Sequence, residues 1–235
     1  MGIRAVQNLI DFFRRKKQHK LEMLKKNNTI EIAPSCQNYE LNIEGRGNTV
    51  IIKDNTFART KVSIYIYGDN NSVIIDESVY IDSLNIVMGS KEKTLGKICN
   101  SSFHIGAKTG LQGIDYTALN SNTFCNIGEN CMIAFDVKMF NTDGHPVFDN
   151  DTGKIINKVR GIEIGNHCWI AAHTSILKNS VLPDNSILGW GAVFSGSKNT
   201  EKNCAFAGNP AKVVRRNVRW AVDGSDCGYV ENMQD

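Results

Sequence analysis

The sequence of 235 residues contains no apolar run of about 18 residues or more, the length that a membrane-spanning helix requires. Its N-terminus also lacks the apolar core and the small-residue cleavage site of a signal peptide. Both absences favour a cytoplasmic protein without a transmembrane segment.

Cysteine pairs are also missing, although the chain has seven cysteines, at positions 36, 99, 125, 131, 168, 204 and 227. A structural zinc site needs ligands at short spacings such as C-x2-C, and none of these spacings occurs. We therefore expect no metal site, and an odd number of reduced thiols that pack as small apolar side chains.

A strong overall charge is absent too, because the net charge is only +3. Residues 1–29 contain eight Lys or Arg and two Asp or Glu, and the other 206 residues contain nineteen against twenty-two. The basic character therefore belongs to the N-terminal segment. A slightly acidic body is not expected to bind nucleic acid.

Residues 1–27 carry the pattern of a basic amphipathic helix. Apolar residues recur at helical spacing, with a cluster of basic residues at 14–17 beside them: Val6, Leu9, Ile10, Phe13, and then Leu21 and Leu24. Such a helix can cap the body or pack on a partner subunit, or it can lie on an anionic membrane surface as a peripheral contact. We favour the packing role.

A repeat begins at residue 28. Asn28, Asn48 and Asn71 open three similar units spaced by 20 and 23 residues, and each continues as short β-branched runs separated by turn residues. Strands and turns that return at a regular period are typical of a solenoid.

The repeat then tightens to six residues. Large apolar residues recur six apart, with small residues often following them: Ile127, Ile133, Met139, and then Ile164, Ile170, Ile176, Leu182, Leu188 and Phe194. A helix repeats at 3.6 residues and an ordinary strand at 2, so neither explains this period. A triangular coil with one hexad per side does, and it stacks Ile164 on Leu182 and Ile170 on Leu188. The period therefore predicts a parallel β-helix.

Residues 140–161 interrupt this period and contain "NTDGHPVF", a composition that favours turns. Because the wall of a solenoid is regular, functional side chains are carried by segments that leave it. We expect this loop to lift His145 off the wall. No Gly-x-Ser-x-Gly nucleophile motif is present, so a covalent acyl-enzyme is not indicated.

The chain resembles the hexapeptide-repeat acetyltransferases in its hexads and in three further stretches: "NTDGHPVF", "IEIGNHCWIAAHTSILKNSVLPDNSILGWGAV" and "AGNPAKVV". Among them the bacterial capsular polysaccharide O-acetyltransferases, those acting on polysialic acid, are the most similar. The resemblance covers residues 28–220 and implies an all-β fold, a left-handed parallel β-helix, with residues 221–235 as a C-terminal tail.

The resemblance implies catalytic roles for two residues. His145 would be the general base that takes the proton of a sugar hydroxyl, and Trp169 would lie beside the reacting thioester, where an indole N–H can donate to developing charge. Asp143 either orients the imidazole or caps its own turn.

Acetyl-CoA is the co-substrate that the resemblance implies. Lys212 and Arg215 would then meet its phosphates, while Ala172 and Ser195 would contact the pantetheine arm. Trp190 stands where the family has a small residue, so the arm either stacks on the indole or follows a different channel.

We expect a homotrimer with the active site between neighbouring subunits, again from the resemblance. The predicted function is transfer of acetyl to a hydroxyl of a capsular or O-antigen polysaccharide. Two alternatives are acetylation of a xenobiotic or small sugar and a non-catalytic β-helix binding scaffold.

Overall fold

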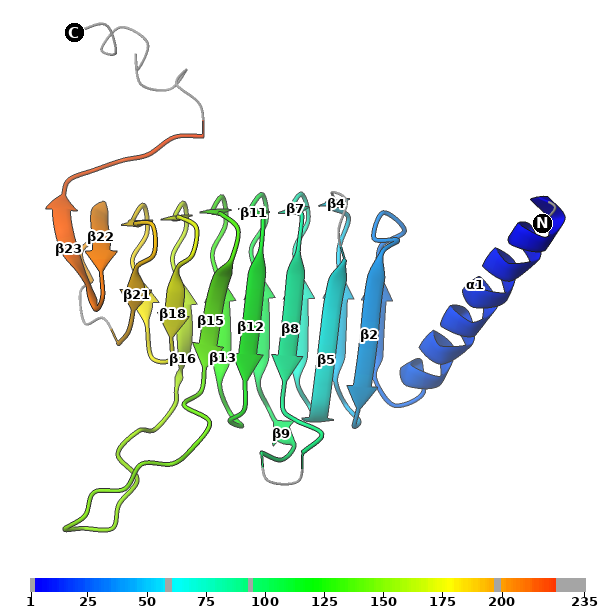
Figure 1. Cartoon of the computed structure of the whole chain (residues 1–235), viewed down its shortest axis with the longest axis horizontal. Helices are drawn as coiled ribbons and strands as arrows, with labels where there is room; N and C mark the ends of the chain where they lie inside the picture. Colours follow the sequence, from blue (N-terminus) through cyan, green and yellow to red (C-terminus); the bar gives the residue numbers. More distant parts are fainter. Residues whose placement is uncertain (1–2, 58–60, 93–94, 197–199, 223–235) are drawn as a thin grey trace, which may run out of the picture.

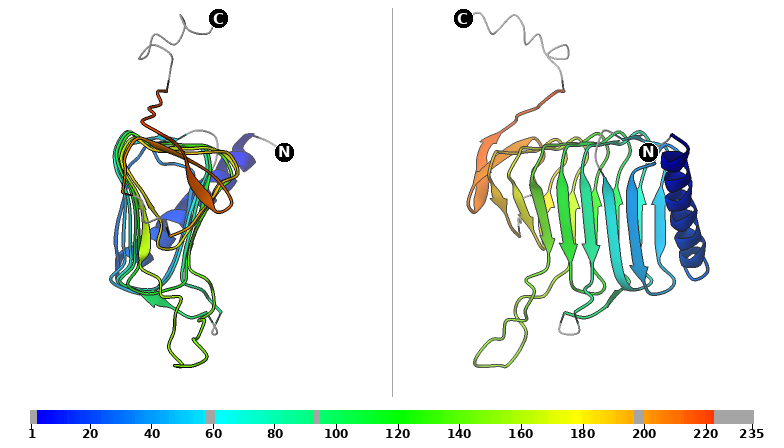
Figure 2. Two further views of the ribbon diagram at one scale, coloured as in Figure 1. Left: turned by 90° about the vertical axis from the view of Figure 1, so that its left-hand side faces the viewer. Right: turned by 45° about the vertical axis from the view of Figure 1, so that its right-hand side comes forward.

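The structure is a computed structural model that describes residues 3–57, 61–92, 95–196 and 200–222. It consists of one helix followed by short strands that wind into a β-helix (Figure 1). Seen down the axis of the coil, successive turns superpose (Figure 2). The prediction of an all-β parallel solenoid with one N-terminal helix is confirmed, whereas its left-handedness stays a prediction.

Three sheets form the walls of the coil. Sheet 1 contains, in spatial order, β1 (Thr29–Ile32), β3 (Thr49–Ile52), β6 (Ser72–Ile75), β10 (Ser102–Ile105), β13 (Phe124–Ile127), β16 (Gly161–Ile164) and β19 (Val181–Leu182). Sheet 2 contains β4 (Thr56–Phe57), β7 (Tyr80–Ile81), β11 (Gly110–Leu111), β14 (Met132–Ile133), β17 (Trp169–Ile170), β20 (Ile187–Leu188), β22 (Cys204–Gly208) and β23 (Ala211–Arg216). Sheet 3 contains β2 (Tyr39–Glu44), β5 (Val62–Asp69), β8 (Leu84–Met88), β12 (Ile114–Ala118), β15 (Val137–Asn141), β18 (Ser175–Leu177) and β21 (Val193–Phe194), and β9 (Ile98–Cys99) pairs with β5 beside it.

The pairing within the three sheets is parallel except between β22 and β23, an antiparallel pair that ends sheet 2. Ile164 pairs with Leu182, Ile170 with Leu188, and Ile176 with Phe194, as the six-residue period predicts. All six side chains are buried in the core. Each wall of these turns therefore buries at least one large apolar side chain six residues after the last, which accounts for the hydrophobic period.

The asparagines that open the first units form a ladder inside the coil. Asn28 Oδ1 accepts hydrogen bonds from the backbone N–H and the side-chain amide of Asn48, and Asn48 Oδ1 accepts the same two bonds from Asn71. Asn48 Nδ2 also donates to the carbonyl of Gly68 at 2.9 Å. Asn48 and Asn71 are fully buried, so these bonds satisfy polar groups that water cannot reach.

Helix α1 (Ile3–Lys25) lies across the first coil (Figure 2). Its residues Leu21 and Leu24 pack against the hydrophobic core, next to the exposed end of sheet 1. No helix among the described residues combines the length and the apolarity needed to cross a membrane. Most of the expected tail, residues 223–235 with Cys227, lies outside the described residues; the six other cysteines are unpaired, and five of them are buried.

Candidate active site

A long loop leaves the coil between β15 and β16 (Figure 1). Phe148 and Ile155 form an antiparallel bridge, and Ile156 N–H donates to the carbonyl of Val147 at 2.9 Å. Asn141, buried at the end of β15, donates to the hydroxyl of Tyr116 at 3.2 Å. The segment of residues 142–160 is thus a hairpin held at its base.

Asn157 joins the two arms of this hairpin. Its side-chain amide donates to Asp143 Oδ2 at 2.7 Å and to the carbonyl of His145 at 2.9 Å, and its Oδ1 accepts from Val147 N–H at 2.8 Å. The backbone on both sides of His145 is therefore fixed, while the imidazole remains exposed.

Asp143 also connects the hairpin to the wall of the coil. Lys178, which follows β18, places its Nζ 3.0 Å from Asp143 Oδ2 and donates to the carbonyl of Asn157 at 3.0 Å. Partial burial of Asp143 alone would raise its pKa, but the hydrogen bonds from Lys178 and Asn157 hold that pKa below its usual value. The recorded bonds of this carboxylate order the loop, and its role in orienting the imidazole stays a prediction.

A cavity of about 400 Å³ opens beside His145. Its walls come from the hairpin and from the preceding coils, including Leu95, Leu119, Asn120, Asn157 and Lys158. The side chains are mixed in polarity, which suits a hydroxylated ligand better than an apolar one.

Trp169 lies elsewhere, on β17 of sheet 2. It is 40% exposed, in register between Met132 and Ile187, and its ring lies 6.3 Å from that of Trp220. Trp220 is itself stacked on His167 at 4.5 Å and donates to the His167 carbonyl at 2.9 Å. The exposed indole of Trp169 is therefore supported by an ordered aromatic neighbour and faces the outside of the coil.

The corner between sheets 2 and 3 gathers further aromatic groups. Trp190 is 66% exposed and its ring lies 4.8 Å from His173 and 5.8 Å from Phe135. His173 Nδ1 lies 2.7 Å from an Asp136 carboxylate oxygen. Ala172 is buried beneath this corner. An exposed aromatic surface thus replaces the small residue that the resemblance implies at Trp190.

The predicted CoA-binding residues divide between two places. Lys212 and Arg215 are exposed on β23, at the end of the sheet that holds Trp169. Ser195 is exposed after β21, at the opposite edge of sheet 3. We call the edge at which the strands of sheet 3 end, and from which the hairpin leaves, the loop edge. The edge at which these strands begin is called the tryptophan edge.

One chain does not bring His145 and Trp169 together. His145, Asp143 and Ser195 lie at the loop edge, whereas Trp169, Ala172 and Trp190 lie at or next to the tryptophan edge, and none of the latter lines the cavity beside His145. Within one chain these residues therefore form two separate groups.

Sequence reasoning did not find Asn157 and Lys178. Asn157 lies inside the expected loop, but nothing in the order of residues shows which of its polar side chains bridges the arms. Among the described residues, no three His, Cys, Asp or Glu side chains gather closely enough to hold a metal ion. The prediction of a metal-free protein stays a prediction.

Comparison with known proteins identifies the family. The chain is 32% identical over 190 residues to the polysialic acid O-acetyltransferase of Neisseria meningitidis, covering 75% of this chain and 87% of that protein. The chain belongs to the hexapeptide-repeat acetyltransferase family. The expected acyltransferase class is thereby confirmed, close to the polysialic acid O-acetyltransferases.

Two further relatives agree with this assignment. The chain is 34% identical over 117 residues to the polysialic acid O-acetyltransferase of Escherichia coli O1:K1 / APEC, and this match spans 50% of the chain but only 37% of the relative. The crystal structure of the polySia-specific acetyltransferase NeuO superposes with a TM-score of 0.69 at 28% identity, over 84% of this chain and 79% of that one. No family model matches the sequence.

Proposed function

We propose that this acetyltransferase transfers acetyl from acetyl-CoA to a hydroxyl of an acidic bacterial capsular polysaccharide, with polysialic acid as the first candidate. The similarity to two polysialic acid O-acetyltransferases supports the acceptor class. The exposed His145 on a hairpin fixed by Asn157 is the observation that carries the chemistry.

In this mechanism His145 takes the proton of the acceptor hydroxyl as the oxygen attacks the thioester carbonyl. The new C–O bond forms, the tetrahedral oxyanion collapses with cleavage of the C–S bond, and the proton passes from the imidazole to the leaving thiolate. The Trp169 indole N–H donates to the oxyanion, which is worth most at a site shielded from water. His145 supplies the general base and Trp169 the charge stabilisation.

The active site of this proposal lies between subunits of a homotrimer. The hairpin of one subunit reaches the tryptophan edge of its neighbour, and cyclic symmetry repeats this site three times. The separation of His145 from Trp169 within one chain supports this arrangement. The coil is left-handed in the same proposal, as the resemblance implies.

Residues of β23 and of the tryptophan edge hold the acetyl donor in this scheme. Lys212 and Arg215 are exposed on β23 and present cations to the phosphates of CoA, and the pantetheine arm passes Ala172 and the Trp190 ring on its way to Trp169. Ser195 contacts the arm from the loop edge of the neighbouring subunit. No step needs a metal ion, and the enzyme acts in the cytoplasm on the polymer or its precursor.

The proposal is tested by measuring free thiol released from acetyl-CoA with a panel of acceptors. The panel contains acidic capsular polysaccharides, neutral polysaccharides and small sugars, and mass spectrometry of the acceptor confirms an added acetyl ester. Release with acidic polymers supports the proposal. If only the small sugars cause release, xenobiotic or small-sugar acetylation is favoured. If no acceptor causes release, the binding scaffold is favoured.

A further inference from the structure

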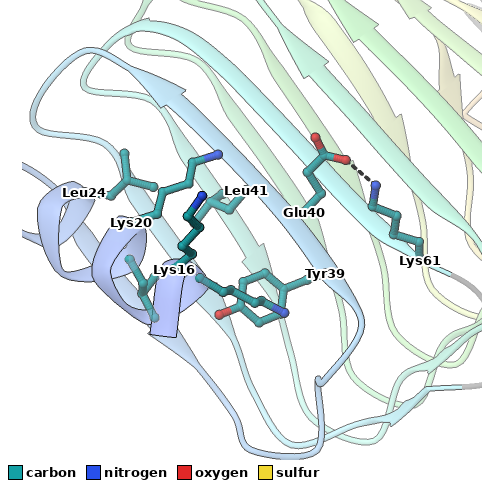
Figure 3. Close-up of a pocket in the computed structure, with 9 residues that line it drawn as sticks. Lys16, Lys20, Leu24, Tyr39, Glu40, Leu41 and Lys61 are labelled. Carbon is teal, nitrogen blue, oxygen red and sulfur yellow. Dashed lines mark hydrogen bonds and ion pairs between the residues drawn. The ribbon is translucent and has the colours of Figure 1, made fainter. Parts of the chain in front are cut away.

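A second concave surface lies far from the hairpin, where α1 crosses the first coil. It is a groove of about 400 Å³ between α1 and the beginning of β2 (Figure 3). Four lysines and one glutamate line it: Lys16, Lys17, Lys20, Lys61 and Glu40. We call this surface the lysine groove.

Two of these lysines are engaged in holding the groove together. Lys17 donates to the carbonyl of Gln37 at 2.9 Å, and its Nζ lies 3.6 Å from the centre of the Tyr39 ring. Lys61 forms an ion pair with Glu40 on the wall opposite the helix (Figure 3). Because that pair is neutral as a unit, the positive potential of the groove comes from the helix side.

Lys16 and Lys20 supply that potential together with Lys17, and Lys16 Nζ lies 4.6 Å from the centre of the Phe12 ring. Lys16 and Lys20 both extend from α1 toward β2 over a floor that includes Leu24 and Leu41 (Figure 3). Apolar walls of low dielectric concentrate the field of the cations in a cleft, which favours an anion there over one on a flat surface. The aliphatic floor and the cationic rim of the groove together suit a polymer that carries both C–H surfaces and carboxylates.

We infer that the lysine groove binds a segment of acidic polysaccharide and anchors the polymer while another part of it is acetylated. This inference rests on the proposed function, because it names a second contact for the same acceptor. A membrane surface fits the groove less well, since Leu21 and Leu24 are packed against the coil, and the apolar side chains that α1 exposes, Val6, Phe12 and Met23, do not line the groove.

The position of the groove suits an anchor. It lies at the beginning of β2, hence on the tryptophan edge of sheet 3, which also holds the corner next to Trp169. Five strand spacings separate β2 from β18, where the Trp169 coil joins sheet 3, a distance of roughly 24 Å. An acidic polymer that follows this edge can occupy both places at once, so its effective affinity exceeds that of a short acceptor.

The test uses the full-length chain carrying His145→Ala, so that binding is measured without turnover. End-labelled long polysialic acid is titrated by fluorescence anisotropy against this protein and against versions with added Lys16→Gln/Lys20→Gln or Lys25→Gln/Lys26→Gln. Lys25 ends α1 and Lys26 follows it directly, so the second pair removes the same charge from the same segment outside the groove. Lys16→Gln/Lys20→Gln should raise Kd by about 2- to 30-fold, the range for two exposed ion pairs, and should reduce the salt dependence.

Kinetics with intact His145 separate this inference from the proposed function. Lys16→Gln/Lys20→Gln should raise the KM for long polymer and leave kcat and the KM for a short oligosaccharide unchanged. Equal Kd values for the two lysine pairs, or binding to phosphatidylglycerol vesicles without binding to polymer, would overturn the inference. Failure of the wild-type enzyme to acetylate any polysaccharide overturns the proposed function, and the binding titration still decides whether the groove holds acidic polymer.

Discussion

The Nζ of Lys178 lies 3.0 Å from Oδ2 of Asp143, and this ion pair ties the hairpin that carries His145 to the wall of the coil. The Lys178 side chain is only 15% exposed. An ion pair of this kind is less screened by solvent than a fully exposed one. The loop that carries His145 is therefore positioned by a residue of the next coil.

Lys178→Met should lower kcat by about 10- to 100-fold, because a displacement of about 1 Å of a catalytic group costs on the order of 100-fold in rate. The melting temperature should change little, and hydrogen–deuterium exchange of residues 141–157 should increase. The control is Lys154→Met, which removes the charge of an exposed side chain in the same hairpin. A variant Lys178→Met with unchanged exchange in the hairpin would contradict the positioning role.

The pKa of Asp143 gives the pH dependence of this contact. Because its folded pKa is depressed, the contact contributes its full stability above the unfolded pKa of about 3.9 and loses it as the pH falls through the folded value. The hairpin should thus remain attached at neutral pH and detach only in strong acid. Carbon-13 NMR of the Asp143 carboxyl should show a midpoint below about 3.9 in the wild type and a higher one in Lys178→Met. Identical midpoints in the two proteins would contradict the ion pair.

The fold could be predicted from the sequence because its period has one physical cause. Side chains six residues apart, such as Ile170 and Ile176, enter the same core from successive walls, so the period survives in the order of residues. The repeated Asn at positions 28, 48 and 71 was equally visible. The hydrogen-bonding role of these asparagines could not be predicted, since a ladder of side chains depends on the register between coils.

The candidate site was only partly accessible to sequence reasoning. Motifs singled out His145 and Trp169, yet nothing local to those motifs shows that His145 lies at the loop edge and Trp169 on sheet 2, next to the tryptophan edge. Lys178 could not be found, because its partner is decided by how the hairpin folds back onto the wall. Contacts between segments that only folding brings together produce no regular spacing in the sequence, so they cannot be predicted from it.

Asn48→Ala should destabilise the first coils strongly. The substitution removes the acceptor of two Asn71 donors and leaves the Gly68 carbonyl without its donor, and each buried group left unpaired costs about 1–3 kcal/mol. A melting temperature lower by at least about 5 °C is expected, since 1 kcal/mol corresponds to about 2–4 °C in a protein of this size.

The control for this prediction is Asn42→Ala. Asn42 is half-buried on sheet 3, and its amide lies 3.5 Å from the Tyr67 hydroxyl, a long and weak hydrogen bond. Its replacement should change the melting temperature by less than about 2 °C. Equal effects of the two substitutions, measured by circular dichroism, would show that the buried ladder is not what stabilises the coil.

A shared active site predicts recovery of activity in mixed oligomers. His145→Ala and Trp169→Phe should each be nearly inactive alone, yet coexpression should give active sites that combine an intact hairpin with an intact tryptophan edge. In a random equal mixture about a quarter of the sites are of this kind, so about a quarter of the wild-type rate is expected. Acetyl transfer by doubly tagged, purified oligomers measures it. No recovery in such oligomers would place both residues in one subunit.

The most direct measurement of the central claim is acceptor-dependent thiol release from acetyl-CoA by wild type, His145→Ala and the control His104→Ala. His104 is 39% exposed and bonded to Asp76 on another part of the coil. The account predicts release that requires an acidic polysaccharide, falls by about 100-fold or more in His145→Ala and is retained in His104→Ala. Equal release by wild type and His145→Ala would contradict it.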